Sequence, residues 1–521
     1  MTAGTKYNIE KPYYPIVYVR GYAMRHAERE ETFNDTYYGF SATSVEKREA
    51  LPPDYSEADV FEGQLIRFMK IRDYGYADAV NRGLEVFHAN PSRSIWVSRF
   101  YDRDYIMGSH RSIEEHADDL YKLVCQTIPT RLKASGVNLG QGDKDYKVIL
   151  IAHSMGGLVC RTLIQNLLPH RYKEDPKRWI HRLVTLGTPH RGIELGNIPD
   201  FLEDVVSSQL NPFGSNIFNE ERMRDYLKLQ GKKGKKYRYD VHSLGPQDTH
   251  HDFPVKRCLC IIGSDHPSYS VTKGMTGNFS DGLVKQDRAY VVAGEAPVDN
   301  HRYSDDQVCY YANVHRAHSG YRGIVNSLES YENIQRFLFG NIKAEISLEN
   351  IQIHTPEDGY SQYFYDFEFL ISIRGTSVYL HRREQDPCEN AVRLRRKDIP
   401  ERLLLHTGFM NSKLKEDDAK FSRFALTLRV IEYRVEEGFL WDREYPGRPI
   451  YVETLEIRVG DSDPSQPGDE VGYRWRSEVS DWKQMQADNG VFRVPLRHVD
   501  TISAEITIKA GLWPDVGLTK D

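Results

Sequence analysis

The sequence of 521 residues predicts an α/β fold with a mainly parallel sheet, followed by a C-terminal all-β domain of the sandwich type. Two observations carry this prediction. Strand and helix patterns alternate over the first 340 residues, as they do where helices cover a parallel sheet. From residue 341 onward, apolar residues recur with period two, which indicates an antiparallel sandwich of about seven or eight strands. We therefore expect two domains, 1–340 and 341–521.

The elements of the first region follow from the spacing of its apolar residues. Short apolar runs predict strands at 16–19, 94–98, 147–152, 181–186, 255–262 and 310–314. Apolar residues four apart predict a helix over 113–132, and further helices are expected at 156–168 and 327–339. In the second region the alternation is clearest in 365–373, 426–430, 455–459 and 502–508. Such alternation places one face of each strand in a core.

The composition argues against several classes of protein. With 69 basic against 75 acidic residues the net charge is −6, which gives no reason to expect a nucleic-acid partner. No apolar run approaches the roughly 20 residues of a membrane-spanning helix, and the chain does not begin with a secretory signal. Six cysteines in so long a chain do not make a disulfide framework. We expect a cytoplasmic protein, with export by another route left open.

Two groups of metal-ligand residue types give only weak signals. Cys258 and Cys260 form a C-x-C pair, but no second pair accompanies it at the spacing of a zinc site. His250, His251 and Asp252 are neighbours in a polar stretch and are expected to be surface or structural residues. We expect neither a metal nor a cofactor.

The strongest local motif surrounds Ser154. An apolar strand ends at this serine and a helix begins directly after it, in the run V-I-L-I-A-H-S-M-G-G-L-V. A sharp strand-to-helix turn strains the serine backbone and exposes its hydroxyl. Small residues, Ala152 and Gly156, stand two before and two after the serine, where neighbouring backbone crowds the chain. The positive end of the helix favours negative charge developing nearby. The pattern indicates a nucleophilic serine.

This motif resembles the G-x-S-x-G elbow of α/β hydrolases, with alanine in place of the first glycine. The run G-T-P-H-R-G at 187–192, after the next strand, adds to the likeness. Together they are typical of lipase-like serine esterases, a group that includes bacterial lipases, lecithin–cholesterol acyltransferase and inositol-deacylase relatives. The resemblance covers residues 12–340 and implies the α/β-hydrolase fold, in which the serine is followed along the chain by an acid and then a histidine.

Each later member of the triad has two candidates. For the acid, the resemblance favours Asp281, whose loop N-F-S-D-G-L-V is similar to the x-D-G-x-V loop of bacterial lipases. Asp265, directly after a predicted strand, is the alternative. For the base, the fold places a histidine between the last strand and the last helix, where both His318 and His315 stand. We favour His318 because it lies further into the loop.

The resemblance also implies an oxyanion hole made of two backbone N–H groups. One comes from Met155, the residue after the nucleophile. The other comes from the loop V-R-G-Y-A after the first strand, in which Tyr22 takes the position of the donor. This loop departs from the H-G-x pattern of lipases because Arg20 replaces the histidine.

The function expected from these residues is hydrolysis of carboxylic esters, with a lipid-like acyl chain, through an acyl-enzyme on Ser154. Acyl transfer and thioester cleavage use the same groups and stay open. A scaffold that is catalytically inactive, acting as a binding or regulatory protein, is the alternative from another class. An acyl-ester or lipid substrate is the expected partner, and the C-terminal domain is expected to contact a membrane surface, a glycan or a protein.

The alternation of strands and helices lapses over 193–254. Phe201, Leu202, Val205 and Val206 share one helical face there, and a basic run follows at 232–236. Two interpretations stay open: a surface insertion with a solvated loop, or a lid whose apolar face covers the active site.

Overall fold

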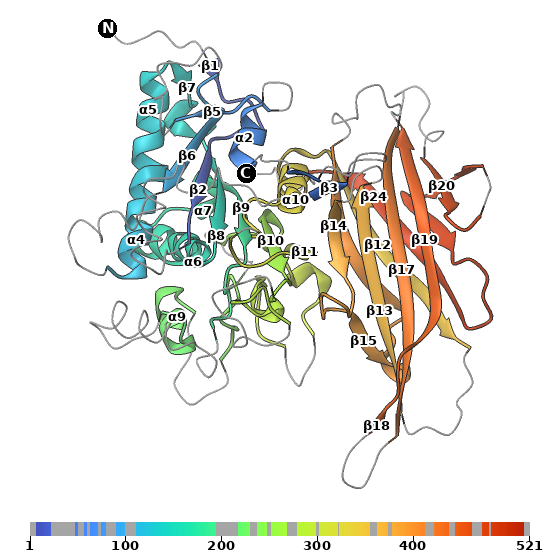
Figure 1. Ribbon diagram of the computed structural model, residues 1–521. Coiled ribbons are helices and arrows are strands. Elements are labelled where there is room, and N and C mark those ends of the chain that lie inside the picture. Colours follow the sequence, from blue (N-terminus) through green and yellow to red (C-terminus); the bar gives the residue numbers. More distant parts are fainter. Residues whose placement is uncertain are drawn as a thin grey trace. The chain divides into compact units, whose positions relative to one another are not determined.

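A computed structural model gives the structure of the chain (Figure 1). It describes residues 7–21, 47–49, 57–59, 63–70, 74–79, 90–98, 111–193, 217–229, 237–246, 252–267, 279–297, 302–320, 322–354, 362–373, 378–411, 421–436, 443–460, 471–478 and 481–514. Two compact units form: Met1–Tyr311 with Arg316–Tyr331, and Ala312–His315 with Glu332–Asp521. The boundary between the two units near the end of the first one falls between Tyr331 and Glu332. The domain boundary expected between residues 340 and 341 stays a prediction.

The first unit is built on a seven-stranded sheet with the order β11-β10-β9-β8-β2-β6-β5. The pairs that join its neighbours from β10 to β5 are all parallel. Its strands are β2 (Ile16–Val19), β5 (Ala77–Asp78), β6 (Ser94–Ser98), β8 (Val148–His153), β9 (Ile180–Leu186), β10 (Cys258–Gly263) and β11 (Tyr310–Val314). Because β2 lies between β6 and β8, its carboxyl end meets the end of β8, where the serine motif stands.

The helices of the first unit turn apolar side chains toward the sheet. Three helical segments follow one another without a break, α4 (Ile113–Tyr121), η3 (Lys122–Thr127) and α5 (Ile128–Ala134). Ser112 and Glu115 begin α4 with reciprocal side-chain caps. After β8 come α6 (Met155–Thr162) and η5 (Leu163–Tyr172), then α7 (Pro176–Trp179). The other α-helices described in the first unit are α2 (Gln64–Met69) and α9 (Glu220–Tyr226). The helix α10 (Leu328–Phe339) begins in the first unit and continues into the second from Glu332 onward.

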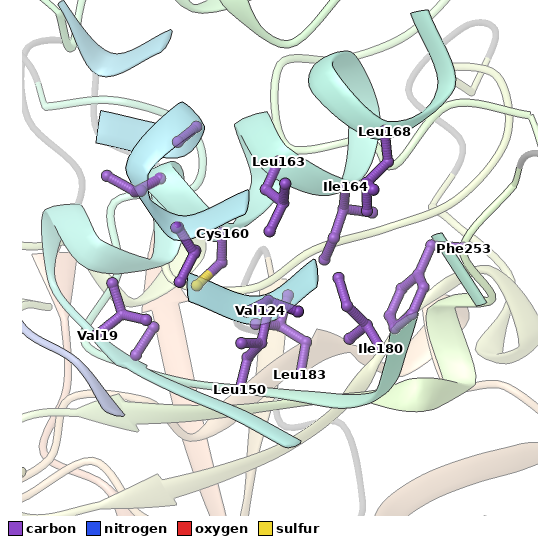
Figure 2. Packing of buried hydrophobic residues seen from close by; sticks show 14 of the residues in the cluster. Val19, Val124, Leu150, Cys160, Leu163, Ile164, Leu168, Ile180, Leu183 and Phe253 are labelled. Carbon is purple, nitrogen blue, oxygen red and sulfur yellow. The ribbon is translucent and has the colours of Figure 1, made fainter. Parts of the chain in front are cut away.

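One hydrophobic core joins the sheet to α4, η3, α5, α6, η5 and α9. Figure 2 shows Leu150 and Leu183 from the strands gathered with Val124, Cys160 and Leu163 from the helices. All five side chains are fully or almost fully buried. Packing of this kind holds the start of α6 rigidly over the end of β8.

Two predicted boundaries in the first unit differ from the structure by more than two residues. The strand expected over 255–262 begins only at Cys258, because Val255–Arg257 form a 3₁₀ turn closed by the N–H of Arg257 on the carbonyl of Pro254. The helix expected over 156–168 continues to Tyr172 and ends where Lys173 takes a left-handed conformation, with φ 57°.

The described parts of the segment 193–254 belong to the core of the first unit. Met223 and Tyr226 of α9 are fully buried, and Val241 and Leu244 are nearly so. The four apolar residues at 201–206 lie outside the described residues, so a lid in this segment stays a prediction.

The second unit consists of antiparallel sheets, as predicted. A five-stranded sheet has the order β16-β12-β24-β23-β22, and an eight-stranded sheet runs β14-β13-β17-β19-β20-β21 with β15 and β18 paired at its side. The strands are β12 (Ile342–Ile353), β13 (Gln362–Ile373), β14 (Tyr379–Arg383), β15 (Val392–Arg395), β16 (Arg402–Met410), β17 (Phe421–Glu436), β18 (Arg443–Glu444), β19 (Arg448–Gly460), β20 (Val471–Trp475), β21 (Lys483–Gln484), β22 (Ala487–Asp488), β23 (Val491–Pro495) and β24 (Ile502–Leu512).

Side chains from both antiparallel sheets share one hydrophobic core. Leu348 and Ile506 from the five-stranded sheet and Phe367 and Leu428 from the eight-stranded sheet are fully buried in it. This two-layer packing confirms the predicted sandwich. Among the helices of the described residues, none is both long and apolar enough to span a membrane.

Candidate active site

Ser154 occupies a strained turn between β8 and α6. Its φ is 51° and its ψ is −131°, a backbone conformation that non-glycine residues rarely adopt and that costs about 1–3 kcal/mol. Three hydrogen bonds hold the turn. The N–H of Ser154 donates to the carbonyl of Leu186 over 3.0 Å, and the Ser154 carbonyl accepts from Thr188 Oγ1 at 2.9 Å and from the N–H of Gly157 at 3.0 Å. Hydrogen bonds to β9, to the loop after β9 and to α6 therefore hold Ser154 in this strained conformation.

Glycines beside the turn are required by close backbone approach. A Cβ on Gly156 would lie 2.4 Å from the Val19 carbonyl oxygen, and one on Gly21 would lie 2.7 Å from Ser154 Cβ. A Cβ on Gly157 would lie 2.2 Å from Thr188 Oγ1. No side chain fits at such distances, so the glycines after the serine let α6 start directly against the end of β2.

The structure brings Ser154, His318 and Asp281 together in the predicted order. Ser154 Oγ lies 3.0 Å from His318 Nε2, and His318 Nδ1 lies 2.9 Å from Asp281 Oδ2. The carboxylate oxygen accepts from Nδ1–H, which leaves Nε2 as the acceptor for the serine hydroxyl. The backbone N–H of His318 also donates to the Asp281 carbonyl over 2.8 Å.

The carboxylate of Asp281 is held at both oxygens. Its Oδ1 accepts from the N–H of Leu283 at 2.9 Å and from the N–H of Val284 at 2.7 Å, while Oδ2 accepts from His318. The side chain is 1% exposed, and that of His318 is 4% exposed. Ser154 is partly exposed. Only the hydroxyl end of this hydrogen-bonded chain is thus open to a substrate.

The two alternative residues make other contacts. The backbone N–H of Asp265 donates to the Arg316 carbonyl over 3.2 Å, and its side chain is buried. His315 belongs to the second unit, where its Nδ1 lies 3.7 Å from Cys388 Sγ. The hydrogen bonds to His318 and Ser154 described above involve neither of them.

The G-T-P-H-R-G loop after β9 lies against the acid and the imidazole. Gly187 has φ +54°, and a Cβ there would lie 2.8 Å from Asp281 Oδ2 and 3.1 Å from His318 Nδ1. Its N–H donates to the Ile261 carbonyl over 3.0 Å. Gly187 and Thr188 therefore contact the acid–imidazole pair and the serine turn respectively, roles that the sequence motif alone did not assign.

His153, which the sequence reasoning left without a role, supports the loop that carries His318. Its Nε2–H donates to the His318 carbonyl over 3.0 Å, and the two rings lie 4.9 Å apart between centroids. Burial, followed by the nearby His318, holds the pKa of His153 well below its usual range, so the ring stays neutral. The only signal in the sequence was its place directly before the serine.

Arg161, on the same helix as the serine turn, is a second residue that the sequence reasoning missed. It is fully buried, and its guanidinium donates to Gln165 Oε1 and to the carbonyls of His190, Val241 and Ser243. Burial lowers its pKa to about 10. These bonds tie α6 to the G-T-P-H-R-G loop and to residues 241–243.

The predicted oxyanion donors are only partly described. Met155 is the first residue of α6, a position whose N–H has no acceptor within the helix. Its N–H is thus free of the helical ladder and follows the serine directly. Tyr22 lies outside the described residues. Arg20 directly follows β2, and its charge is among the causes that lower the pKa of His153.

Metal-ligand residues do not gather in the described part of the chain, where no group of three or more His, Cys, Asp or Glu side chains could hold an ion. His250 and His251 lie outside the described residues.

Comparison with known proteins finds similarity within the first unit. A model of the PGAP1-like alpha/beta domain matches residues 96–265. Triacylglycerol lipase 2 of Saccharomyces cerevisiae is 36% identical over 106 residues, which span 19% of this chain and 28% of the yeast protein. The match thus covers well under two thirds of that relative.

Two solved structures are similar at a lower level. The phospholipase PlaB from Legionella pneumophila has 12% identity and a TM-score of 0.33, covering 90% of this chain and 98% of its own. The Tle4–Tli4 complex has 13% identity and a TM-score of 0.21, covering 57% of this chain and 72% of its own. TM-scores this low do not establish a common fold.

The parallel sheet, the serine turn at the end of β8, the PGAP1-like match and the yeast relative agree with one another. The first unit has the α/β-hydrolase fold, is similar in part to a PGAP1-like domain and to a triacylglycerol lipase, and is followed by a β-rich C-terminal unit.

Proposed function

We propose that this protein hydrolyses carboxylic esters with a lipid-like acyl chain, using Ser154 as the nucleophile. The observation that carries the proposal is the hydrogen-bonded chain from Ser154 Oγ to His318 Nε2 and from His318 Nδ1 to Asp281, at 3.0 and 2.9 Å. A serine hydroxyl is a weak nucleophile at neutral pH and needs such an oriented base. The strained backbone of Ser154 presents that hydroxyl to the substrate.

The reaction would proceed through an acyl-enzyme. Ser154 Oγ attacks the ester carbonyl carbon while its proton passes to His318 Nε2. The C–O bond to the alcohol then breaks, and the alcohol oxygen takes that proton. A water molecule, deprotonated by the same nitrogen, attacks the acyl carbon and releases the acid, with the proton returning to Ser154. Asp281 keeps the imidazole oriented and favours its protonated form in both steps.

The oxyanion of each tetrahedral intermediate would be stabilised at the start of α6. The N–H of Met155 points out of the helical ladder beside Ser154, and the helix dipole adds partial positive charge there. The resemblance to lipases assigns the second donor to the N–H of Tyr22. The lipid-like substrate is supported by the likeness to the yeast triacylglycerol lipase.

The proposal is tested with the purified protein, a fluorophosphonate probe and three acyl substrates: p-nitrophenyl butyrate, p-nitrophenyl palmitate and palmitoyl-coenzyme A. We expect covalent labelling and turnover of the oxyesters, with the long chain preferred, and loss of both in Ser154→Ala. Ser135→Ala serves as the matched control, because its hydroxyl only bonds the Arg131 carbonyl on an exposed helix end.

Three outcomes would contradict the proposal. Labelling that survives in Ser154→Ala would mean that another residue is the nucleophile. Faster cleavage of the thioester than of both oxyesters would replace the substrate class. Absence of both labelling and turnover in the wild type would favour a binding protein.

A further inference from the structure

The β-rich unit contains a small cavity where its two sheets approach the turn between β23 and β24. The cavity has a volume of about 220 Å³, and its walls include Pro449, Tyr451, Val452, Glu453, Arg497 and Val499. Thr501 Oγ1 donates to the Ile450 carbonyl over 2.6 Å, which fastens the start of β19 to the chain before β24. The cavity is smaller than the roughly 300–1,000 Å³ of typical small-molecule sites, so it fits one ring-sized group.

Tyr451 brings an unsatisfied hydroxyl to this cavity. The residue is 3% exposed, and no acceptor for the proton of its Oη lies within hydrogen-bond distance in the described part of the chain. Burial raises the pKa of Tyr451, so the group stays a neutral O–H donor. The backbone N–H of Arg497, which faces the hydroxyl, is itself a donor and offers no acceptor for that proton. A buried O–H group without an acceptor for its proton is costly, which indicates that a ligand supplies the acceptor.

Arg497 and Glu453 form a charge-compensated wall beside this hydroxyl. Arg497 Nη1 lies 3.5 Å from Glu453 Oε2 and 3.0 Å from Ser477 Oγ, which in turn donates to the same carboxylate. The carboxylate side chain is 9% exposed, whereas that of Arg497 is 50% exposed. The wall therefore presents both donors and an acceptor, with no excess of either charge.

These features select among ligand classes. A phosphate would meet the carboxylate of Glu453 beside Arg497, which opposes anion binding. An acyl chain would leave the Tyr451 O–H without an acceptor and would remove water from the Arg497–Glu453 pair. A neutral ring with several hydroxyl groups can accept from Tyr451, bond both charged groups, and lay its C–H face on Val452, which is 57% exposed.

We propose that this cavity binds a single sugar ring, as one residue of a glycan. The site would give the β-rich unit a role in attaching the protein to glycosylated surfaces or molecules. This proposal does not depend on the hydrolase activity, because no residue of the cavity belongs to the first unit.

The test uses the full chain and saturation-transfer difference NMR with the methyl glycosides of glucose, galactose, mannose and N-acetylglucosamine. We expect at least one to bind in the millimolar range. Tyr451→Phe should weaken that binding about five- to tenfold, because it removes one hydrogen bond. Tyr473→Phe, a tyrosine of β20 outside the cavity, is the matched control and should leave binding unchanged.

A thermal unfolding curve without ligand checks the premise. Tyr451→Phe should be at least as stable as the wild type, since it deletes an unsatisfied hydroxyl. Arg497→Met provides a second variant at a half-exposed position and should also weaken binding.

The proposal is overturned if none of the four glycosides binds, or if binding persists unchanged in both Tyr451→Phe and Arg497→Met. Binding of inorganic phosphate or of phosphatidylcholine vesicles that is lost in Arg497→Met would overturn it as well. A marked loss of stability in Tyr451→Phe would show that the hydroxyl has a partner in the protein and would remove the reason for the site.

Discussion

His153 and His318 are joined by a hydrogen bond of 3.0 Å from the Nε2–H of the first to the backbone carbonyl of the second. The residue before the serine thus fixes the loop that presents the imidazole to the serine. Replacing His153 with Ala leaves that buried carbonyl without its donor, at a cost of about 1–3 kcal/mol. We expect kcat to fall about tenfold with KM nearly unchanged, because the substrate contacts stay in place. Ester hydrolysis kinetics measure the split.

His153→Gln distinguishes positioning from simple packing. A glutamine amide can donate to the same carbonyl, so it should restore part of the lost kcat, while Ala and Phe should not. Equal losses in Gln, Phe and Ala variants would argue against the role of this hydrogen bond.

His318 and His315 give a direct test of the proposed base. His318→Ala should lower kcat by at least about a thousandfold, as loss of the base does in serine hydrolases. His315→Ala should leave most of the activity, because its Nδ1 lies by Cys388 rather than in the chain of hydrogen bonds to Ser154. Steady-state hydrolysis of p-nitrophenyl butyrate is the measurement. The reverse ranking of the two variants would refute the choice of His318.

Gly187 should tolerate no side chain. A Cβ at this position would lie 2.8 Å from Asp281 Oδ2, and the residue also has φ +54°. We expect Gly187→Ala to lower kcat about a hundredfold, because the acid and the imidazole must shift by a few tenths of an ångström or more. The measurement is ester hydrolysis on protein whose folding is checked by circular dichroism.

Gly245 supplies the control for backbone strain alone. Its φ is +86°, but a Cβ there meets nothing within 4 Å. Gly245→Ala should therefore lose some stability and keep its kcat. If both variants lose activity to the same extent, strain rather than the contact with Asp281 explains the effect of Gly187→Ala.

The serine turn could be read from sequence because its determinants are contiguous. The strand of 148–153, the small residues and the helix start all lie within a few positions of Ser154, and each has a local physical cause. His318 lies 164 residues away from the serine, and Asp281 lies 37 residues from His318. For these two residues, the sequence supplied only their order along the chain and two candidates for each position. The choice depends on loop geometry, such as the two backbone N–H groups that hold Asp281 Oδ1.

Other features had no sequence pattern to reveal them. The two-residue strands β18, β21 and β22 are too short to show alternation, so the sandwich has more strands than expected. Met223 and Tyr226 stand on a short helix within a polar stretch, yet both are buried in the core of the first unit. In the sequence Arg161 has no feature that distinguishes it from other helix residues. The structure shows that its guanidinium donates four hydrogen bonds.

Arg161 should be a major contributor to the stability of the first unit. Arg161→Met keeps the volume but removes the donor from the carbonyls of His190 and Val241 and one of two donors from that of Ser243. We expect the free energy of unfolding to fall by about 3–5 kcal/mol. Chemical denaturation measures the change. Arg238→Met, at a side chain that is 66% exposed and forms an ion pair with the exposed Glu295, should change it by less than about 1 kcal/mol.

The β-rich unit should lose stability in mild acid because of His381 and His406. Their rings stack at 4.2 Å and both are buried. Burial lowers the pKa of His406 to about 3 and holds that of His381 well below its usual range, with the neighbouring His406 and Arg383 adding to the effect. In the unfolded chain both titrate near about 6.5.

The sign of the pH dependence follows from which state binds the protons. Below pH ~6.5 the two histidines bind protons in the unfolded chain but not in the folded unit. Their contribution to the free energy of unfolding is therefore fully present above that pH and is lost as the pH falls toward 3. Each histidine contributes up to about 1.4 kcal/mol per pH unit. His406→Phe should reduce the slope of unfolding free energy between pH 6 and pH 5, measured by urea denaturation. His498→Phe, at a side chain that is 93% exposed, should leave that slope unchanged. An identical slope in wild type and His406→Phe would mean that this ring does not resist protonation in the folded unit.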